Sequence, residues 1–152
     1  MYNNPKHFLH EHLTFLESTG IEGKNSGFEN FFAKKGVQYN KNWDQERTIL
    51  DWNGIKKFQF FYDYEGEENV IREWLRNSEL KNFEHLYTWF DYNDPIVKIK
   101  TSDLIEYWEE FTIASVEGLA FVSENGEIFL EFTQSPHYFC ISNFEIKSGS
   151  AI

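Results

Sequence analysis

Two Asn-Gly dipeptides constrain the fold of this 152-residue chain more than any other feature of its sequence. They stand at Asn53-Gly54 and Asn125-Gly126. A two-residue type I′ turn needs positive φ angles, which Asn and Gly tolerate, so each dipeptide predicts an antiparallel β-hairpin. One hairpin is expected over residues 47–62, and the other should pair residues 119–123 with residues 127–133.

Each turn also predicts which residues face each other across its hairpin. The first hairpin should pair Trp52 with Ile55, Asp51 with Lys56 and Ile49 with Phe58. The second should place five apolar side chains on one core face, namely Leu119, Phe121, Ile128, Leu130 and Phe132. It should also set Glu124 opposite Glu127, a like-charge pair that is tolerable where both carboxylates are solvated.

The remaining elements follow from apolar periodicity and from capping residues. Helices are expected over residues 5–19, 28–35, 67–77 and 102–114, and further strands over 84–90, 96–100 and 138–144. The helices and strands do not alternate as regular βαβ units. We therefore expect a single α+β domain over residues 1–152, with a largely antiparallel sheet packed against about four helices.

Several classes of protein are excluded by short apolar runs and by cysteine content. No uninterrupted apolar run exceeds four residues, whereas a membrane-spanning helix needs about 20. The N-terminus lacks a basic region followed by an apolar core, so no secretory signal is expected. Cys140 is the only cysteine, which rules out an internal disulfide. These features favour a cytoplasmic protein that does not enter a membrane.

The charge of the chain is strongly acidic and unevenly distributed. Fourteen basic and 25 acidic residues give a formal charge of −11, and no Lys or Arg lies between Lys100 and Lys147. A tract of one sign is either a solvated surface that favours solubility or a face that attracts a partner of opposite sign. Nucleic acid is not an expected partner, because phosphate binding needs clustered Lys and Arg and the basic pairs here are isolated.

The acidic side chains concentrate on one helix and one hairpin. On the helix over residues 102–114, acidic positions are expected on the side opposite to the apolar stripe. We interpret this helix and the second hairpin as a docking face for a basic protein. The predicted partner-binding residues are Asp103, Glu106, Glu109, Glu110, Glu117, Glu124 and Glu127.

Aromatic residues support a second hypothesis. Phe, Tyr and Trp total 29 residues, more than Ile, Leu and Val together, so the core must be rich in rings. Trp43, Trp52 and Trp89 fall in or near predicted loops and turns and could be exposed. Exposed rings beside carboxylates are compatible with a small-molecule or carbohydrate-binding domain that could also be enzymatic. A third hypothesis is a structural subunit of a larger assembly.

No catalytic motif identifies a reaction, and the sequence predicts no cofactor and no metal ligands. His137 and Cys140, for example, would point to opposite faces of a strand and cannot act as a thiol–imidazole pair there. The leading hypothesis is a non-enzymatic intracellular binding protein. In size, acidity and single-domain layout the chain resembles the small immunity proteins with which bacteria neutralise nuclease and other toxins. This resemblance implies steering by charge and occlusion of a cationic site on the partner.

Overall fold

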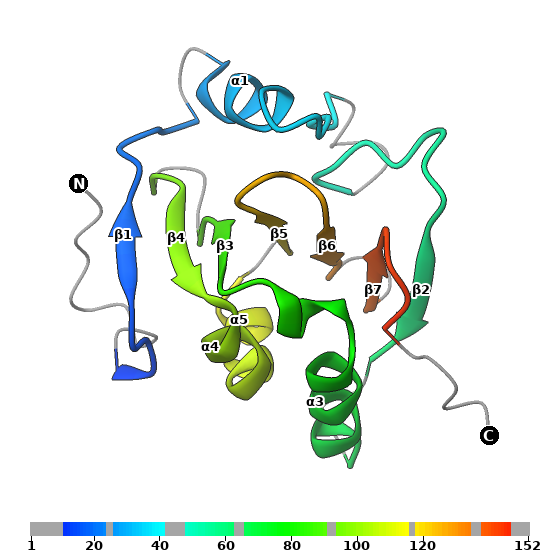
Figure 1. Ribbon diagram of the computed structural model, residues 1–152. Coiled ribbons are helices and arrows are strands. Elements are labelled where there is room, and N and C mark those ends of the chain that lie inside the picture. Colours follow the sequence, from blue (N-terminus) through cyan, green and yellow to red (C-terminus); the bar gives the residue numbers. More distant parts are fainter. Residues whose placement is uncertain are drawn as a thin grey trace.

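The computed structural model describes residues 11–23, 26–41, 48–62, 66–90, 94–115, 118–134 and 138–146. Seven strands in these segments form one antiparallel sheet with the order β1-β4-β3-β5-β6-β7-β2 (Figure 1). The strands are β1 (Leu16–Ser18), β2 (Phe58–Phe61), β3 (His85–Thr88), β4 (Val97–Lys100), β5 (Leu119–Ser123), β6 (Phe129–Phe132) and β7 (Phe139–Ser142). The helices are α1 (Gly27–Ala33), α3 (Glu68–Asn77), the 3-10 helix η3 (Glu79–Asn82), α4 (Thr101–Glu106) and α5 (Trp108–Ala114). The α+β fold class is therefore confirmed.

The β5–β6 hairpin forms in the predicted register, but its turn is not the predicted two-residue type I′ turn. Of Asn125 and Gly126 only the glycine has a positive φ, and its N–H donates to the carbonyl of Ser123 at 3.0 Å. Leu119 pairs with Phe132 and Phe121 with Leu130, which is the register expected from the sequence. Gly126 has a φ of 76°, and a Cβ at this position would collide with the carbonyl oxygen of Lys35. The turn therefore needs glycine both for its backbone conformation and for its close approach to the end of α1.

Two apolar cores lie on the two faces of the sheet. Helices α3, α4 and α5 cover one face, and α1 lies on the other (Figure 1). The first core contains all five predicted hairpin residues and the fully buried rings of Trp108 and Phe111. The second core contains Phe32 of α1 with Trp52 and Trp89, which are only 6% and 7% exposed. These two tryptophans are not available for sugar stacking, and Trp43 lies outside the described residues.

The predicted helix over residues 5–19 is wrong for its C-terminal part. Leu16–Ser18 forms the edge strand β1, in which Leu16 pairs with Ile99 and Ser18 with Val97 of β4. Residues 5–10 lie outside the described part of the chain. The i, i+3, i+4 spacing of apolar residues predicted a helix. In the structure the backbone of Leu16 pairs with β4 and its side chain contacts the first core, so tertiary contacts override the local helical pattern.

The predicted hairpin over residues 47–62 has a turn at the expected position, but its turn type and its strand pairing are wrong. A hydrogen bond of 3.2 Å joins the N–H of Ile55 to the carbonyl of Trp52, yet of Asn53 and Gly54 only the glycine has the positive φ that a type I′ turn needs at both residues. Leu50, however, forms a bridge with Tyr39, and β2 pairs with β7. Trp52 and Ile55 therefore stay together across the turn, whereas Phe58 pairs with Ser142 of β7 in place of the predicted Ile49.

The other predicted elements are confirmed, with one break. Strands β3, β4 and β7 and helix α3 lie within the expected ranges, and helix α1 begins one residue before its expected start at residue 28. The predicted helix over residues 102–114 is divided into α4 and α5 at Tyr107, whose φ and ψ are −116° and 29°. This break changes where the acidic side chains of that segment point.

Candidate functional site

The acidic residues of α4 and α5 do not form one exposed face. Asp103 is only 4% exposed, and its carboxylate accepts hydrogen bonds from the backbone N–H of Thr14 at 2.9 Å and from the Thr14 hydroxyl at 3.0 Å. Asp103 therefore ties the segment before β1 to α4. Glu110 is half-buried, and one of its carboxylate oxygens is shielded from solvent without a hydrogen-bond partner. Glu117 lies outside the described residues.

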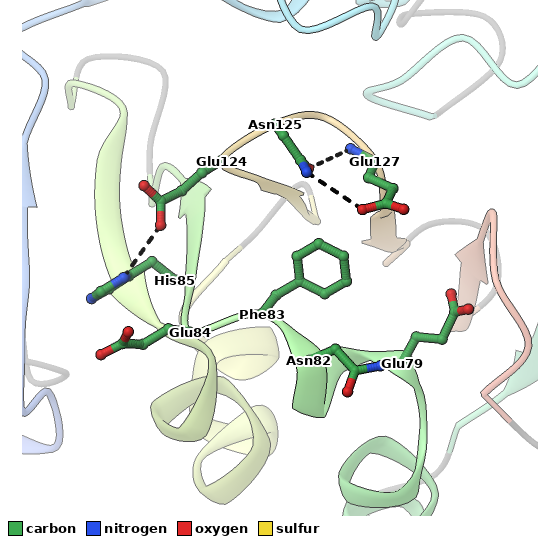
Figure 2. A pocket seen from close by; sticks show the side chains of 8 residues that line it. All are labelled: Glu79, Asn82, Phe83, Glu84, His85, Glu124, Asn125 and Glu127. Carbon is green, nitrogen blue, oxygen red and sulfur yellow. Dashed lines mark hydrogen bonds and ion pairs between the residues drawn. The ribbon is translucent and has the colours of Figure 1, made fainter.

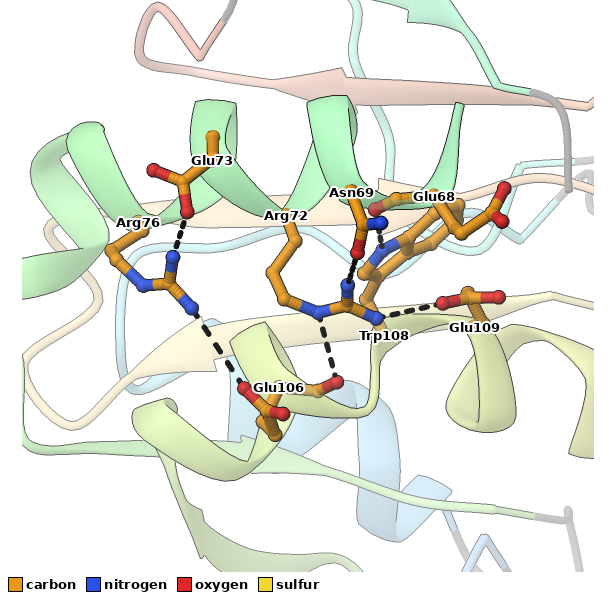
Figure 3. A network of polar contacts seen from close by, with 8 residues as sticks. All are labelled: Glu68, Asn69, Arg72, Glu73, Arg76, Glu106, Trp108 and Glu109. Atoms are coloured by element: carbon orange, nitrogen blue, oxygen red, sulfur yellow. Dashed lines mark hydrogen bonds and ion pairs between the residues drawn. The ribbon is translucent and has the colours of Figure 1, made fainter. Parts of the chain in front are cut away.

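Arginines of α3 neutralise the other two acidic side chains of this segment (Figure 3). Arg72 donates to the carboxylate of Glu109 at 2.7 Å and to the backbone carbonyl of Glu106 at 3.1 Å. Arg76 lies 3.8 Å from the carboxylate of Glu106 and also pairs with Glu73. These contacts join α3 to α4 and α5, so Glu106 and Glu109 have a structural role that periodicity within their own helix could not reveal.

The two acidic residues of the β5–β6 turn lie at a pocket of about 510 Å³. Figure 2 shows Glu124, Asn125 and Glu127 on one side of it and the ring of Phe83 between the turn and η3. The remaining lining residues come from η3 and from the entry to β3; they are Glu79, Asn82, Glu84 and His85. We call these eight residues the acidic pocket.

One carboxylate of the acidic pocket is already paired. Glu124 lies 2.9 Å from the ammonium of Lys98 and 3.3 Å from Nδ1 of His85. The hydrogen bond from Lys98 is the main cause of a lowered pKa of Glu124, and the same bond raises the pKa of Lys98. Glu124 is therefore held ionised and in a fixed position.

Three carboxylates of the acidic pocket remain without a cation. Glu79, Glu84 and Glu127 form no ion pair with any residue that the structure describes. Glu127 contacts the side chain of Asn125, and all three side chains belong to exposed residues. A pocket with three unpaired carboxylates, two amides and one aromatic ring can bind an ammonium or guanidinium group.

Sequence reasoning identified Glu124 and Glu127 but not Glu79 or Glu84. The two missed residues precede the hairpin by about 40 positions and stand outside the acid-only tract. Strand pairing brings them together, because β3 is antiparallel to β5 with Leu86 opposite Ser123. The spacing of residues along the chain does not specify how β3 pairs with β5, so the sequence could not show that Glu79 and Glu84 lie beside the hairpin turn.

A different acidic residue, Glu131, is completely buried in the second core. It is 1% exposed and stands between Ala120 and Ile141 of the neighbouring strands. Its carboxylate accepts hydrogen bonds from the N–H groups of Ile49 (2.5 Å) and Leu50 (3.0 Å) and from Nε1 of Trp52 (3.0 Å). Burial raises the pKa of Glu131 to about 7, although these three hydrogen bonds oppose the rise.

Glu131 therefore holds the segment around residues 49–52 on the sheet. It also adds to the effect of burial on Cys140, whose pKa is raised mainly because the thiol is buried. Neither side chain is accessible to a substrate, so the raised pKa of Glu131 reflects a structural role rather than acid–base chemistry.

Comparisons with protein-family models, curated proteins and solved structures find no match to this chain. Within the described ranges, no three His, Cys, Asp or Glu side chains gather as a possible metal site. In the same part of the chain, every helix is too short or too polar to cross a bilayer. The function is therefore argued from the geometry of the acidic pocket.

Proposed function

We propose that this protein is a non-enzymatic binding protein whose acidic pocket receives a Lys or Arg side chain of a basic partner protein. The observation that carries the proposal is the meeting of three unpaired carboxylates with Phe83 in one concave surface. Occlusion of a cationic site on the partner in this way would fit the resemblance to small immunity proteins.

The chemistry of the pocket matches a cationic side chain. An ammonium or guanidinium group can pair with Glu79, Glu84 or Glu127, and such charge-assisted hydrogen bonds are stronger than neutral ones. A cation over the face of the Phe83 ring gains a further attraction. Glu124 stays in place whether or not the pocket is occupied, because its carboxylate pairs with Lys98 and its backbone carbonyl accepts a hydrogen bond from the ammonium of Lys35.

The overall charge of −11 supports the same partner class. A surface of one sign raises the rate of encounter with a partner of the opposite sign, and this gain falls as salt screens the charges. The acidic pocket would then provide the specific contact after electrostatic encounter. Glu131 does not compete with this role, because it is sealed inside the second core.

The proposal is tested by comparing two triple variants of equal charge. In the pocket variant, Glu79, Glu84 and Glu127 are replaced by Gln. In the control variant, the exposed Glu22, Glu67 and Glu145 are replaced by Gln. Wild type and both variants are immobilised, exposed to lysate of the source cell at low and moderate salt, and the retained proteins are identified by mass spectrometry.

We expect wild type and the control variant to retain the same basic protein, and the pocket variant to lose it. With the purified partner, the association rate of the pocket variant at low salt should fall by about tenfold or more, since steering changes such rates by factors of about 10 to 1,000. Equal loss in both triple variants would show that charge alone matters and would refute the pocket. Retention by the pocket variant would refute it as well.

A further inference from the structure

A second cavity of about 450 Å³ lies where η3 and the start of α4 adjoin. It shares Phe83 and Glu84 with the acidic pocket but has a different character. Its apolar wall is made by Leu80, Phe83 and Ile105. A cavity of this size with an apolar wall and a few polar groups has the composition of a small-molecule site.

One polar group in the wall of this cavity lacks a partner. Thr101 is 2% exposed, and its hydroxyl oxygen makes no hydrogen bond with any described residue. Its backbone N–H is already used, since it donates to the carbonyl of Glu84 at 2.9 Å. Buried hydroxyls nearly always have a partner. The Thr101 oxygen is itself shielded from solvent, so a ligand in the cavity reaches it only when the side chain rotates toward the cavity.

The cations around this cavity are also incompletely paired. Arg76 is engaged by Glu73 and Glu106. Lys81 and Lys100 line the cavity and form no ion pair with any residue of the described segments, although the chain carries a charge of −11. Among the residues that line the cavity, three cations, Arg76, Lys81 and Lys100, stand against two carboxylates, Glu84 and Glu106, which leaves an excess of one positive charge.

We propose that this cavity binds a small organic monoanion in which a carboxylate is joined to an apolar body. The carboxylate pairs with Lys81 and Lys100, and it accepts a hydrogen bond from the Thr101 hydroxyl after that side chain rotates toward the cavity. The apolar body packs against Leu80, Phe83 and Ile105. An excess of one positive charge matches a monocarboxylate better than a phosphate dianion. An inorganic anion would leave the apolar wall without a contact, so a ligand with an apolar body fits the cavity better.

The first test uses three probes that separate charge from apolar contact. They are 4-phenylbutyrate, which has both features, acetate, which lacks the apolar body, and 4-phenylbutylamine, which carries the opposite charge. Each is titrated into the full-length protein and followed by amide NMR shifts. We expect 4-phenylbutyrate to saturate below about 10 mM, with the shifts concentrated at residues 80–84 and 100–105, and the other two probes to bind at least about tenfold more weakly.

Variants then locate the binding. Replacing both Lys81 and Lys100 by Gln should weaken 4-phenylbutyrate by about tenfold or more, because two charge-assisted contacts are lost. Replacing the exposed Lys41 and Lys57 by Gln removes the same charge elsewhere and should leave the affinity unchanged. Thr101→Val keeps the shape of the side chain and should weaken binding about threefold to tenfold through loss of the hydroxyl alone.

Three results would overturn the proposal. One is the absence of saturable binding of 4-phenylbutyrate up to about 10 mM. Another is equal binding of 4-phenylbutylamine. The third is unchanged affinity for 4-phenylbutyrate in a Lys81 and Lys100 variant that retains a native NMR spectrum. If that variant does not fold, unchanged affinity in Thr101→Val overturns the proposal instead.

Discussion

The strongest quantitative prediction concerns the pH dependence of folding through Glu131. The pKa of this buried carboxyl is about 7 in the folded protein, against an ordinary value of 4.5. The folded state therefore holds a proton that the unfolded state releases between these two values. Stability should be highest below about pH 4.5 as far as this group is concerned, fall as the pH rises to about 7, and remain constant above it.

The size of this effect follows from the difference between the two pKa values. A tenfold change in proton affinity is worth about 1.4 kcal/mol, so the full difference corresponds to about 3 kcal/mol. Between about pH 5.5 and pH 8 this linkage should amount to about 2 kcal/mol. That range avoids the isoelectric point near 4.8, where the protein carries little net charge.

The perturbation is Glu131→Gln, which keeps the shape of the side chain and removes its titration. Urea denaturation of wild type and variant is measured from about pH 5.5 to pH 8. The difference in the free energy of unfolding should move by about 2 kcal/mol in favour of the variant as the pH rises across this range. Glu127→Gln, which changes an exposed carboxylate of the same hairpin, should show no comparable movement.

A constant difference between wild type and Glu131→Gln would refute this reasoning. A constant difference is what a pKa of Glu131 lowered on folding would give, because stability would then change with pH only below the ordinary value of 4.5. In that case the hydrogen bonds from Ile49, Leu50 and Trp52 would outweigh the cost of burying the charge. The experiment therefore decides which of two opposing effects is larger.

Three further predictions follow from single contacts. Gly54→Ala should lower the free energy of unfolding by about 1 kcal/mol, because it only forces a residue with a side chain into a positive φ of 75°. Gly126→Ala should lower it by at least about 3 kcal/mol, because the added Cβ also collides with the carbonyl of Lys35. Urea denaturation measures both losses. Asp103→Asn should destabilise the fold by about 2 kcal/mol and accelerate amide hydrogen exchange over residues 14–18, since Thr14 loses its charged acceptor. Replacing Glu106, Glu109 and Glu110 by Gln should lower the melting temperature, because it weakens the contacts with α3. Capture of the basic partner should remain unchanged. Loss of capture would show that the docking surface lies on α4 and α5.

Local rules predicted much of the secondary structure. The Asn125-Gly126 turn predicted a hairpin whose observed register, Leu119 with Phe132, is the expected one. The register is right because the alternation of the flanking side chains specifies it, although the turn is not of the predicted type I′. A turn also forms at Asn53-Gly54, but Leu50 and Phe58 have other partners, so turn residues alone did not determine strand pairing.

The candidate site could be predicted only in part, for the same reason. Glu124 and Glu127 were identified because they belong to an acidic tract along the chain. Glu79 and Glu84 join them only through the pairing of β3 with β5. Conversely, Asp103 and Glu109 belong to the same tract, but contacts with Thr14 and Arg72 use their charges inside the fold.

The sequence by itself determined the α+β class, the aromatic core, the acidic charge and the two turns, because these depend on composition and on neighbours a few residues apart. Only the tertiary structure decided which carboxylates are buried, paired or free. Glu131 illustrates the distinction, since its three hydrogen-bond donors lie 79 to 82 residues away in the chain. The ionisation of a carboxyl depends on the charges, donors and solvent around it in space, and sequence spacing does not specify those distances.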